Sequence, residues 1–242
     1  CISGILAGLL GIGGGLVIVP ALSMLLIFSG APTDMIIKMS LATSLACILL
    51  TGLSSVRAHH ARGAVLWQLS PSLGLGLALG ALSGAVVASY LPDAGLGLIF
   101  GIFAILMALQ MLWQSHQHNV NNSQQEELVR LPTSPVLTVW GKGIVVAEAL
   151  LGIGGGTNTV PLLVHYGVRM QKAIGTGAAG GLPIALGGVV GYIISGWDVV
   201  QRPAWSVGYV YVPAVLGICV TSLFTAPLGA RLAHALPAKR LK

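Results

Sequence analysis

The chain has 242 residues, of which 55% are hydrophobic and 7% are charged, and its formal net charge is +6. Soluble globular domains carry about 25% charged residues, so this composition excludes an ordinary soluble domain. The basic residues stand singly between apolar stretches, which is a topology signal of membrane proteins, so we expect no nucleic-acid partner.

Apolar stretches with the length of a membrane span cover most of the chain. Uncharged segments occupy residues 39–56, 64–92, 94–115, 173–197 and 203–230. A helix of about 20 apolar residues crosses the ~30 Å hydrocarbon layer of a bilayer. The 34 glycines suit lipid-embedded helices, because small residues let their backbones approach closely. We therefore predict an all-α membrane protein that crosses the bilayer several times.

The first apolar segment is interrupted by the motif GIGGG at residues 11–15. The pieces on either side, residues 1–10 and 16–28, are each short for a full crossing at about 1.5 Å per residue. They fit a re-entrant hairpin that reaches mid-membrane, in which glycine supplies the unusual backbone angles of a tight reversal. The alternative is that the glycines only allow tight helix packing.

Three blocks of the first half recur in the second half, in the same order. Residues 8–22 recur as 149–163 with ten of fifteen positions identical, 41–46 recur as 174–179, and 81–92 recur as 226–237. The matches keep the motif GIGGG, pair Thr43 with Thr176, and pair Pro92 with Pro237. We infer an internal duplication.

The duplication divides the chain into three parts. These are a first transmembrane repeat (1–113), a polar linker (114–135) and a second transmembrane repeat (136–242). The linker contains two prolines and has the composition of an exposed loop. Residues 94–113 of the first repeat have no counterpart, so we expect the second repeat to lack its last helix.

We expect the two repeats, of about four apolar segments each, to have inverted topology. An inverted arrangement puts eight Lys and Arg residues of the connections on one side of the membrane and two on the other, whereas a parallel arrangement gives seven and three. Because these residues concentrate on the cytoplasmic side, the inverted arrangement is favoured. Inversion needs an odd number of crossings in each repeat, and a re-entrant glycine segment leaves three.

Two hairpins that enter from opposite faces would bring the glycine triplets together near the midplane, where discontinuous helices of transporters form their sites. The triplets are Gly13, Gly14 and Gly15 in the first repeat and Gly154, Gly155 and Gly156 in the second. Free N–H groups at the start of the following helix, together with its positive dipole end, favour an anion. We therefore predict that these glycines bind a small anionic solute.

Polar side chains near the triplets are further candidates for contact with this solute. They are Thr157 and Asn158 after the second triplet, and Thr43, Ser44 and Thr176 in the segment that follows each triplet. The alternative role of Thr157 is to cap the half-helix. The alternative for the other hydroxyls is a hydrogen bond to their own backbone.

Two residues are candidates for other chemistry inside the membrane. Glu148 lies in a run otherwise free of charge and is a candidate proton carrier, or else a partner of Lys142. Cys47 is a candidate contact for sulfur chemistry, or else a small buried hydrophobe. No CxxC, HExxH or GxSxG pattern occurs, so we expect no enzyme activity, no metal and no cofactor.

With the doubled GIGGG…VP motif, followed one segment later by ATS or GTG, the chain resembles the TauE/SafE family, the sulfite exporter and anion permease family of membrane proteins. The resemblance covers both repeats. It implies a secondary transporter of a small anion, such as sulfite or an organosulfonate, across the bacterial inner membrane. An anion channel and a membrane sulfur-relay protein that uses Cys47 are the alternatives. The anion, the coupling ion, the direction of transport and the oligomeric state stay open.

Overall fold

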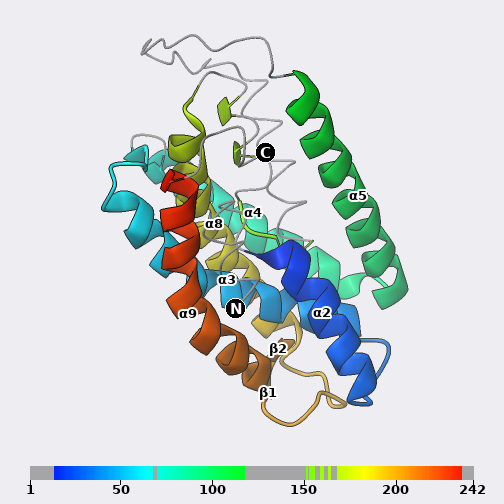
Figure 1. The fold of residues 1–242 in the computed structure, drawn as a ribbon. Coiled ribbons are helices and arrows are strands. Elements are labelled where there is room, and N and C mark those ends of the chain that lie inside the picture. The colour runs from blue at the N-terminus through cyan, green and yellow to red at the C-terminus, as the bar shows by residue number, and fades with distance from the viewer. Residues whose placement is uncertain are drawn as a thin grey trace.

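The computed structural model describes residues 14–67, 70–117, 151, 153–155, 159–160, 163–164 and 168–235. Its elements, shown in Figure 1, are α2 (Gly15–Phe28), α3 (Ile36–His60), α4 (Ser70–Tyr90), α5 (Asp93–Gln117), α8 (Met170–Ser195), β1 (Ser206–Val207), β2 (Val210–Tyr211) and α9 (Val212–Ala235). The two short strands pair as an antiparallel hairpin in the connection from α8 to α9. The described part of the chain is mostly helical, which confirms the predicted helical class, and this hairpin is the departure from the all-α prediction.

Three of the helices are long and apolar enough to cross a membrane, judged by length and composition. They are Ile36–His60, Asp93–Gln110 and Met170–Ser195. Helix α5 carries a row of large apolar side chains that are more than half exposed, namely Leu98, Ile102, Ile105 and Leu109. Such a face is unfavourable in water and suits the hydrocarbon of a bilayer.

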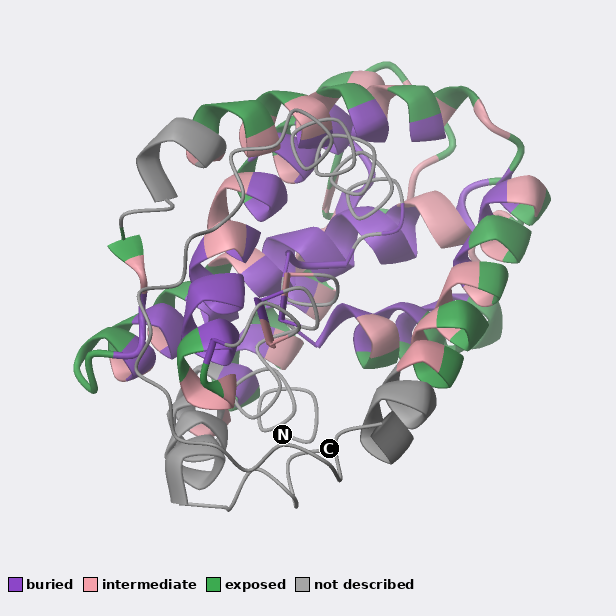
Figure 2. Ribbon diagram, turned by 90° about the horizontal axis from the view of Figure 1, so that it is seen from above, coloured by how far each residue is buried: buried purple, intermediate pink, exposed green. Residues whose placement is uncertain are grey.

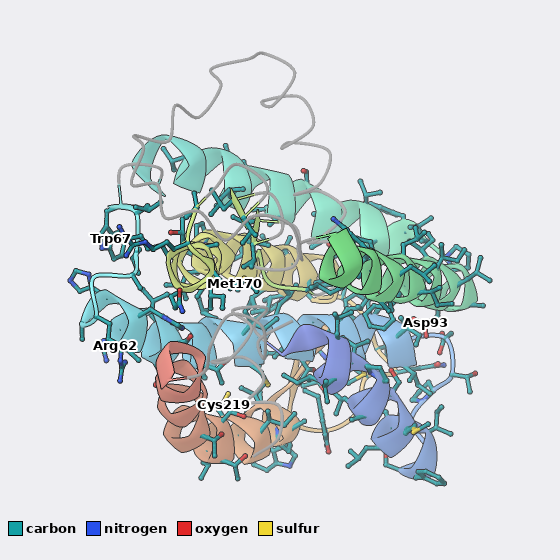
Figure 3. All side chains as sticks on the ribbon, turned by 45° about the horizontal axis from the view of Figure 1, so that its top comes forward. Arg62, Trp67, Asp93, Met170 and Cys219 are labelled. Carbon is teal, nitrogen blue, oxygen red and sulfur yellow. The ribbon has the colours of Figure 1, made fainter. Side chains whose placement is uncertain are left out.

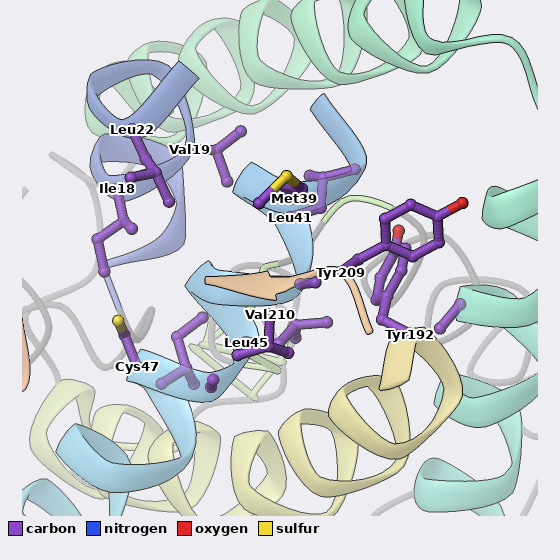
Figure 4. Packing of buried hydrophobic residues seen from close by; sticks show 14 of the residues in the cluster. Ile18, Val19, Leu22, Met39, Leu41, Leu45, Cys47, Tyr192, Tyr209 and Val210 are labelled. Carbon is purple, nitrogen blue, oxygen red and sulfur yellow. The ribbon is translucent and has the colours of Figure 1, made fainter. Parts of the chain in front are cut away.

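Helix α3 forms the centre of the fold. All residues from 41 to 48 are buried, and α3 packs against α2, α8 and α9. Figure 2 shows the buried residues gathered in the middle of the molecule and the exposed residues on the outer helices. Side chains of the main core, including Met39, Leu41, Leu45 and Tyr192, meet around α3 (Figure 4).

Helices α3 and α8, which carry the duplicated block around Thr43 and Thr176, pack against each other in antiparallel directions. The contacts pair Leu45 with Gly188, Gly52 with Leu182, and His59 with Gly175. As the residue number rises along α3, the number of the contacting residue falls along α8. The pair Gly52–Leu182 lies near the middle of both helices.

Helices α4 and α8 run parallel and approach each other through glycine. A Cβ on Gly187 would collide with the carbonyl oxygen of Ala78, and a Cβ on Gly191 would lie 2.8 Å from both the Leu82 carbonyl oxygen and the Ala85 Cβ. Here glycine has the role of letting two backbones touch. The high glycine content of α8 is therefore explained in part by packing.

The connections that follow α3 and α8 differ in length but share two features. Gly63 and Gly208 both have left-handed backbone angles, with φ of 64° and 57°, and stand at matching positions eighteen residues before the aligned blocks at 81 and 226. Two matching backbone hydrogen bonds follow, from Ala64 N–H to the His59 oxygen at 3.0 Å and from Tyr209 N–H to the Tyr192 oxygen at 3.4 Å. These are positions that the predicted duplication aligns.

Candidate functional site

The last two glycines of the first motif, Gly14 and Gly15, stand at the start of a short helix. Helix α2 begins at Gly15, and its N-cap residue Gly14 has φ 79° and ψ 2°, in the left-handed region. The Gly14 carbonyl oxygen accepts hydrogen bonds from the N–H groups of Val17 and Ile18, at 3.1 and 3.0 Å. With 14 residues, α2 is about 21 Å long, which is too short to cross the hydrocarbon layer. Gly13 lies outside the described residues.

Gly14 and Gly15 are both buried, and no side chain of the described residues caps this end of α2. The first N–H groups of a helix have no partner within the helix. The N-terminus of α2 therefore presents backbone donors and a positive dipole end inside the protein.

The second glycine motif packs on the middle of α8. Residues 153 and 154 are not helical, and both are buried. A Cβ on Gly155 would lie 3.1 Å from the backbone of both Gly180 and Gly181, and 2.9 Å from Ile184 Cδ1. Since α8 runs from Met170 to Ser195, this contact lies near the middle of a helix of spanning length.

The two glycine motifs share one core. Ile153 of the second motif and Leu151 directly before it are packed in the same buried cluster as Ile18 and Leu22 of α2. Residues at both motifs therefore belong to the buried core around α3. The remaining candidates of the second motif, which are Gly156, Thr157 and Asn158, lie outside the described residues, as does Glu148.

The paired threonines connect the two halves of the chain. Thr43 Oγ1 accepts a hydrogen bond from Tyr211 N–H at 3.0 Å, and Thr176 Oγ1 accepts one from Leu66 N–H at 3.1 Å. Leu66 and Tyr211 stand at matching positions, fifteen residues before the aligned blocks. Thr176 Oγ1 also donates to the Lys172 carbonyl oxygen at 2.7 Å. Each threonine of one half therefore holds a connection of the other half.

Ser44 and Cys47 lie on α3 and are fully buried. Cys47 belongs to the same buried core cluster as Cys219 of α9, and neither thiol is part of a disulfide. Among the described residues no group of three or more His, Cys, Asp or Glu side chains could hold a metal ion.

An acidic side chain that the sequence analysis did not single out caps α3. Asp93, at the start of α5, is buried, and its two carboxylate oxygens accept the N–H groups of Ile37 at 2.7 Å and of Lys38 at 3.1 Å. A carboxylate at the positive end of a helix is stabilised by the helix dipole. Asp93 thereby joins α5 to the N-terminus of α3 (Figure 3).

The same end of α3 faces the hairpin between α8 and α9. The Lys38 Nζ lies 6.0 Å from the ring centroid of Tyr209. Burial raises the pKa of Tyr209, and the negative charges of Asp34 and Asp93 raise it further. The phenol therefore stays neutral around pH 7.

The opposite end of α3 carries the run RAHHAR at residues 57–62. Its side chains separate into two environments, because Arg57, His60 and Arg62 are exposed whereas His59 is fully buried. His60 Nδ1 accepts the indole N–H of Trp67 at 3.0 Å. Charged and aromatic side chains at a helix end are typical of a membrane interface.

Comparison with protein families gives one match, to the family described as "Sulfite exporter TauE/SafE", over residues 1–242. A probable membrane transporter protein of Haemophilus influenzae is 36% identical over 252 residues, covering 100% of this chain and 89% of the relative. A probable membrane transporter protein of Methanocaldococcus jannaschii is 28% identical over 245 residues, covering 100% of this chain and 86% of the relative. No match was found among solved structures.

Proposed function

We propose that this chain, which belongs to the Sulfite exporter TauE/SafE family, is a secondary transporter that moves a small anion across the membrane. Family membership and the related transporters make it a multi-pass membrane protein of a transporter family and not an enzyme. The class of solute, its binding residues and the mode of transport are the parts that we propose. A bacterial inner membrane is the location that we propose for it.

The antiparallel packing of α3 and α8 is the observation that carries the proposal. Two helices that occupy matching positions of a duplication and pack antiparallel are related by an axis perpendicular to both. If both helices cross the bilayer, that axis lies in the membrane plane, which is the arrangement of inverted repeats in secondary transporters. The reciprocal hydrogen bonds of Thr43 and Thr176 support the same two-fold relation, since paired contacts of this kind arise across a two-fold axis.

The proposed solute site lies between the two glycine motifs. The mid-length position of Gly155 on α8 supports a site at mid-membrane depth. The N-terminus of α2, with Gly14 in a left-handed conformation, supports a site made of backbone N–H donors, which suit an anion. Gly13, Gly156, Thr157 and Asn158 complete this site in the proposal.

The remaining candidates have supporting roles in the proposal. Thr43 and Thr176 hold the connections of the opposite half, and Ser44 lies beside Thr43 on α3. Glu148 carries the proton that couples transport to a gradient. We propose a sulfur oxyanion such as sulfite, or an organosulfonate, as the solute, because the family is described by sulfite export. A compact oxyanion can accept hydrogen bonds from several backbone N–H groups at once.

Ligand-dependent stabilisation of the purified protein tests the proposal. A solute that binds the folded protein raises its stability by RT ln(1 + [L]/Kd), which is about 2.7 kcal/mol at a hundredfold excess over Kd. We expect sulfite or an organosulfonate to raise the thermal midpoint in detergent, and chloride at equal ionic strength to leave it unchanged. The test uses a set of small anions that includes sulfur oxyanions, sulfonates and carboxylates. The proposal fails if none of them gives a saturable rise of the thermal midpoint.

A pair of variants makes the test specific to the site. Gly155→Ala inserts a methyl group against the backbone of α8, so it should abolish the anion-dependent shift. Gly76→Ala is the control, because Gly76 is an exposed residue of α4 whose Cβ position has no described atom within 4 Å. An equal anion-dependent shift in both variants would place binding elsewhere.

A further inference from the structure

The paired helices α3 and α8 have a basic end, at which α3 ends and α8 begins. The two segments lie side by side there, because a Cβ on Gly175 would lie 3.2 Å from His59 Cβ. The hydrogen bond from Leu66 N–H to Thr176 Oγ1 holds the connection after α3 against the same part of α8. Four exposed basic residues belong to these segments, namely Arg57, Arg62, Arg169 and Lys172.

The opposite end of the pair carries every acid whose side chain the structure describes. Its charged residues are Asp34, Asp93, Asp198, Lys38 and Arg202. Figure 3 shows Arg62 and Trp67 at one end of the molecule and Asp93 at the other. Because basic residues concentrate on the cytoplasmic side of membrane proteins, this separation favours a cytoplasmic location of the basic end. Anionic lipids give the cytoplasmic leaflet a negative surface.

One face of α3 changes from apolar to basic as the helix approaches this end. Leu50 and Leu53, which are 39% and 44% exposed, are followed by the exposed Arg57 and His60. The spacings of three, four and three residues keep these four side chains on one face of the helix. Arg57 lies about 6 Å beyond Leu53 along the axis. A phospholipid has the same order, with acyl chains below a charged head group.

The basic part of this face has donors that the described residues leave available. No hydrogen bond or ion pair joins the Arg57 guanidinium to another described residue. His60 Nδ1 accepts the indole N–H of Trp67 at 3.0 Å, so the proton of the neutral imidazole is on Nε2, which can donate to a ligand. The indole of Trp67 is 46% exposed, and tryptophan is enriched at the level of lipid head groups.

We propose that this face of α3 binds an anionic phospholipid of the cytoplasmic leaflet. The Arg57 guanidinium donates to the phosphate oxygens, for which its planar fork is suited, and His60 Nε2–H donates to the same head group. An acyl chain lies along Leu50 and Leu53. These two exposed leucines favour a lipid over a soluble anion, because a soluble anion gains nothing from apolar surface. The other basic residues of this end add to the attraction for a negative surface.

The first experiment measures lipid binding to the purified full-length protein in neutral detergent by native mass spectrometry. We expect phosphatidylglycerol to bind more tightly than phosphatidylcholine with the same acyl chains. Arg57→Gln should weaken phosphatidylglycerol binding about fivefold, as loss of one basic residue at a membrane surface does. Arg202→Gln, at the opposite end of the pair, is the control and should leave the affinity unchanged. Equal affinities of the two lipids, or an Arg57→Gln variant that binds like wild type, overturn the proposal.

A competition arm separates a lipid from a soluble phosphate. Glycerol phosphate carries the same phosphate group without acyl chains, so we expect it to leave bound phosphatidylglycerol in place at equal concentration. Displacement of the lipid by glycerol phosphate would mean that the site takes a soluble anion, which contradicts the proposal.

The last experiment tests the side of the membrane. Single cysteines are introduced by Ala61→Cys at the basic end and Thr33→Cys at the opposite end, both at exposed positions, after the three native cysteines are replaced by alanine. In intact cells of a bacterial expression host, we expect a membrane-impermeant maleimide to label Thr33→Cys. Ala61→Cys should react only after the membrane is permeabilised. The reverse pattern would place the basic end outside and refute binding to the cytoplasmic leaflet.

Discussion

Thr43 Oγ1 accepts a hydrogen bond from the backbone N–H of Tyr211, 168 residues further along the chain, at 3.0 Å. The matching bond joins Thr176 to Leu66 at 3.1 Å. In each half of the chain, the threonine of the aligned block therefore accepts a hydrogen bond from the corresponding backbone N–H of the other half. This reciprocity makes the two halves one structural unit.

Replacing either threonine by valine should destabilise the protein to a similar extent. The variants Thr43→Val and Thr176→Val remove the acceptor of a partly buried backbone N–H, and the loss is at most that of an unsatisfied buried donor, about 1–3 kcal/mol. Thermal or denaturant unfolding in detergent measures the loss, and Thr→Ser at either position should recover most of it. Thr221→Val is the control, because Thr221 is exposed on α9 and its hydroxyl bonds to Ile218 of its own helix at 3.0 Å. Wild-type stability of both valine variants would contradict the role of these bonds.

Gly14 should tolerate asparagine better than alanine. Its φ of 79° lies in the left-handed region, where an L-residue pays about 1–2 kcal/mol and asparagine is among the residues that visit it. We expect the unfolding free energy to fall in the order Gly14, Gly14→Asn, Gly14→Ala. Unfolding curves of the three proteins check the order. Alanine matching glycine would mean that α2 does not begin with this conformation.

Gly155→Ala should disturb the contact between the second glycine motif and α8. The added Cβ would lie 2.9 Å from Ile184 Cδ1 and 3.1 Å from the backbone of Gly180 and Gly181, and backbone atoms cannot move aside as a side chain does. We expect a loss of about 1–3 kcal/mol, typical of overpacking. Gly76→Ala should be neutral or stabilising, since alanine is the better helix former. Unfolding measurements that find the two variants equally stable would rule out the close approach.

Asp93→Ala should weaken the start of α3. It removes the carboxylate that accepts the Ile37 and Lys38 N–H groups, and loss of a helix cap costs about 0.5–2 kcal/mol. Asp93→Asn, which keeps one acceptor oxygen, should lie between alanine and wild type. The matched control is Asp198→Ala, which changes an exposed acid in the α8–α9 connection. The measurement is the thermal midpoint of each variant. If Asp93→Ala lowers it no more than Asp198→Ala does, Asp93 does not cap α3.

The helical membrane architecture and the start of α2 after Gly14 follow from local sequence. Composition predicts the architecture. A glycine triplet before an apolar run predicts the helix start, because only glycine enters the left-handed region at little cost. The matching of Thr43 with Thr176 was also visible in the duplicated blocks. These features need no knowledge of how the halves dock.

The partners of these residues could not be predicted. Tyr211 and Leu66 meet the threonines, and Asp93 meets α3, only when helices far apart in the chain pack together. Helix α8 is a further example, because it stays unbroken through Pro183 and many glycines. Its contacts with α3 and α4 stabilise the helical conformation that the local sequence disfavours, since packing routinely overrides helix propensity.

Flux of sulfite in proteoliposomes under an imposed pH gradient tests the central claim most directly. Secondary transport predicts saturable sulfite movement that an imposed proton gradient drives uphill and that Gly155→Ala abolishes while Gly76→Ala does not. Flux that only runs down the sulfite gradient, indifferent to the pH gradient, would contradict coupled transport and favour an anion channel.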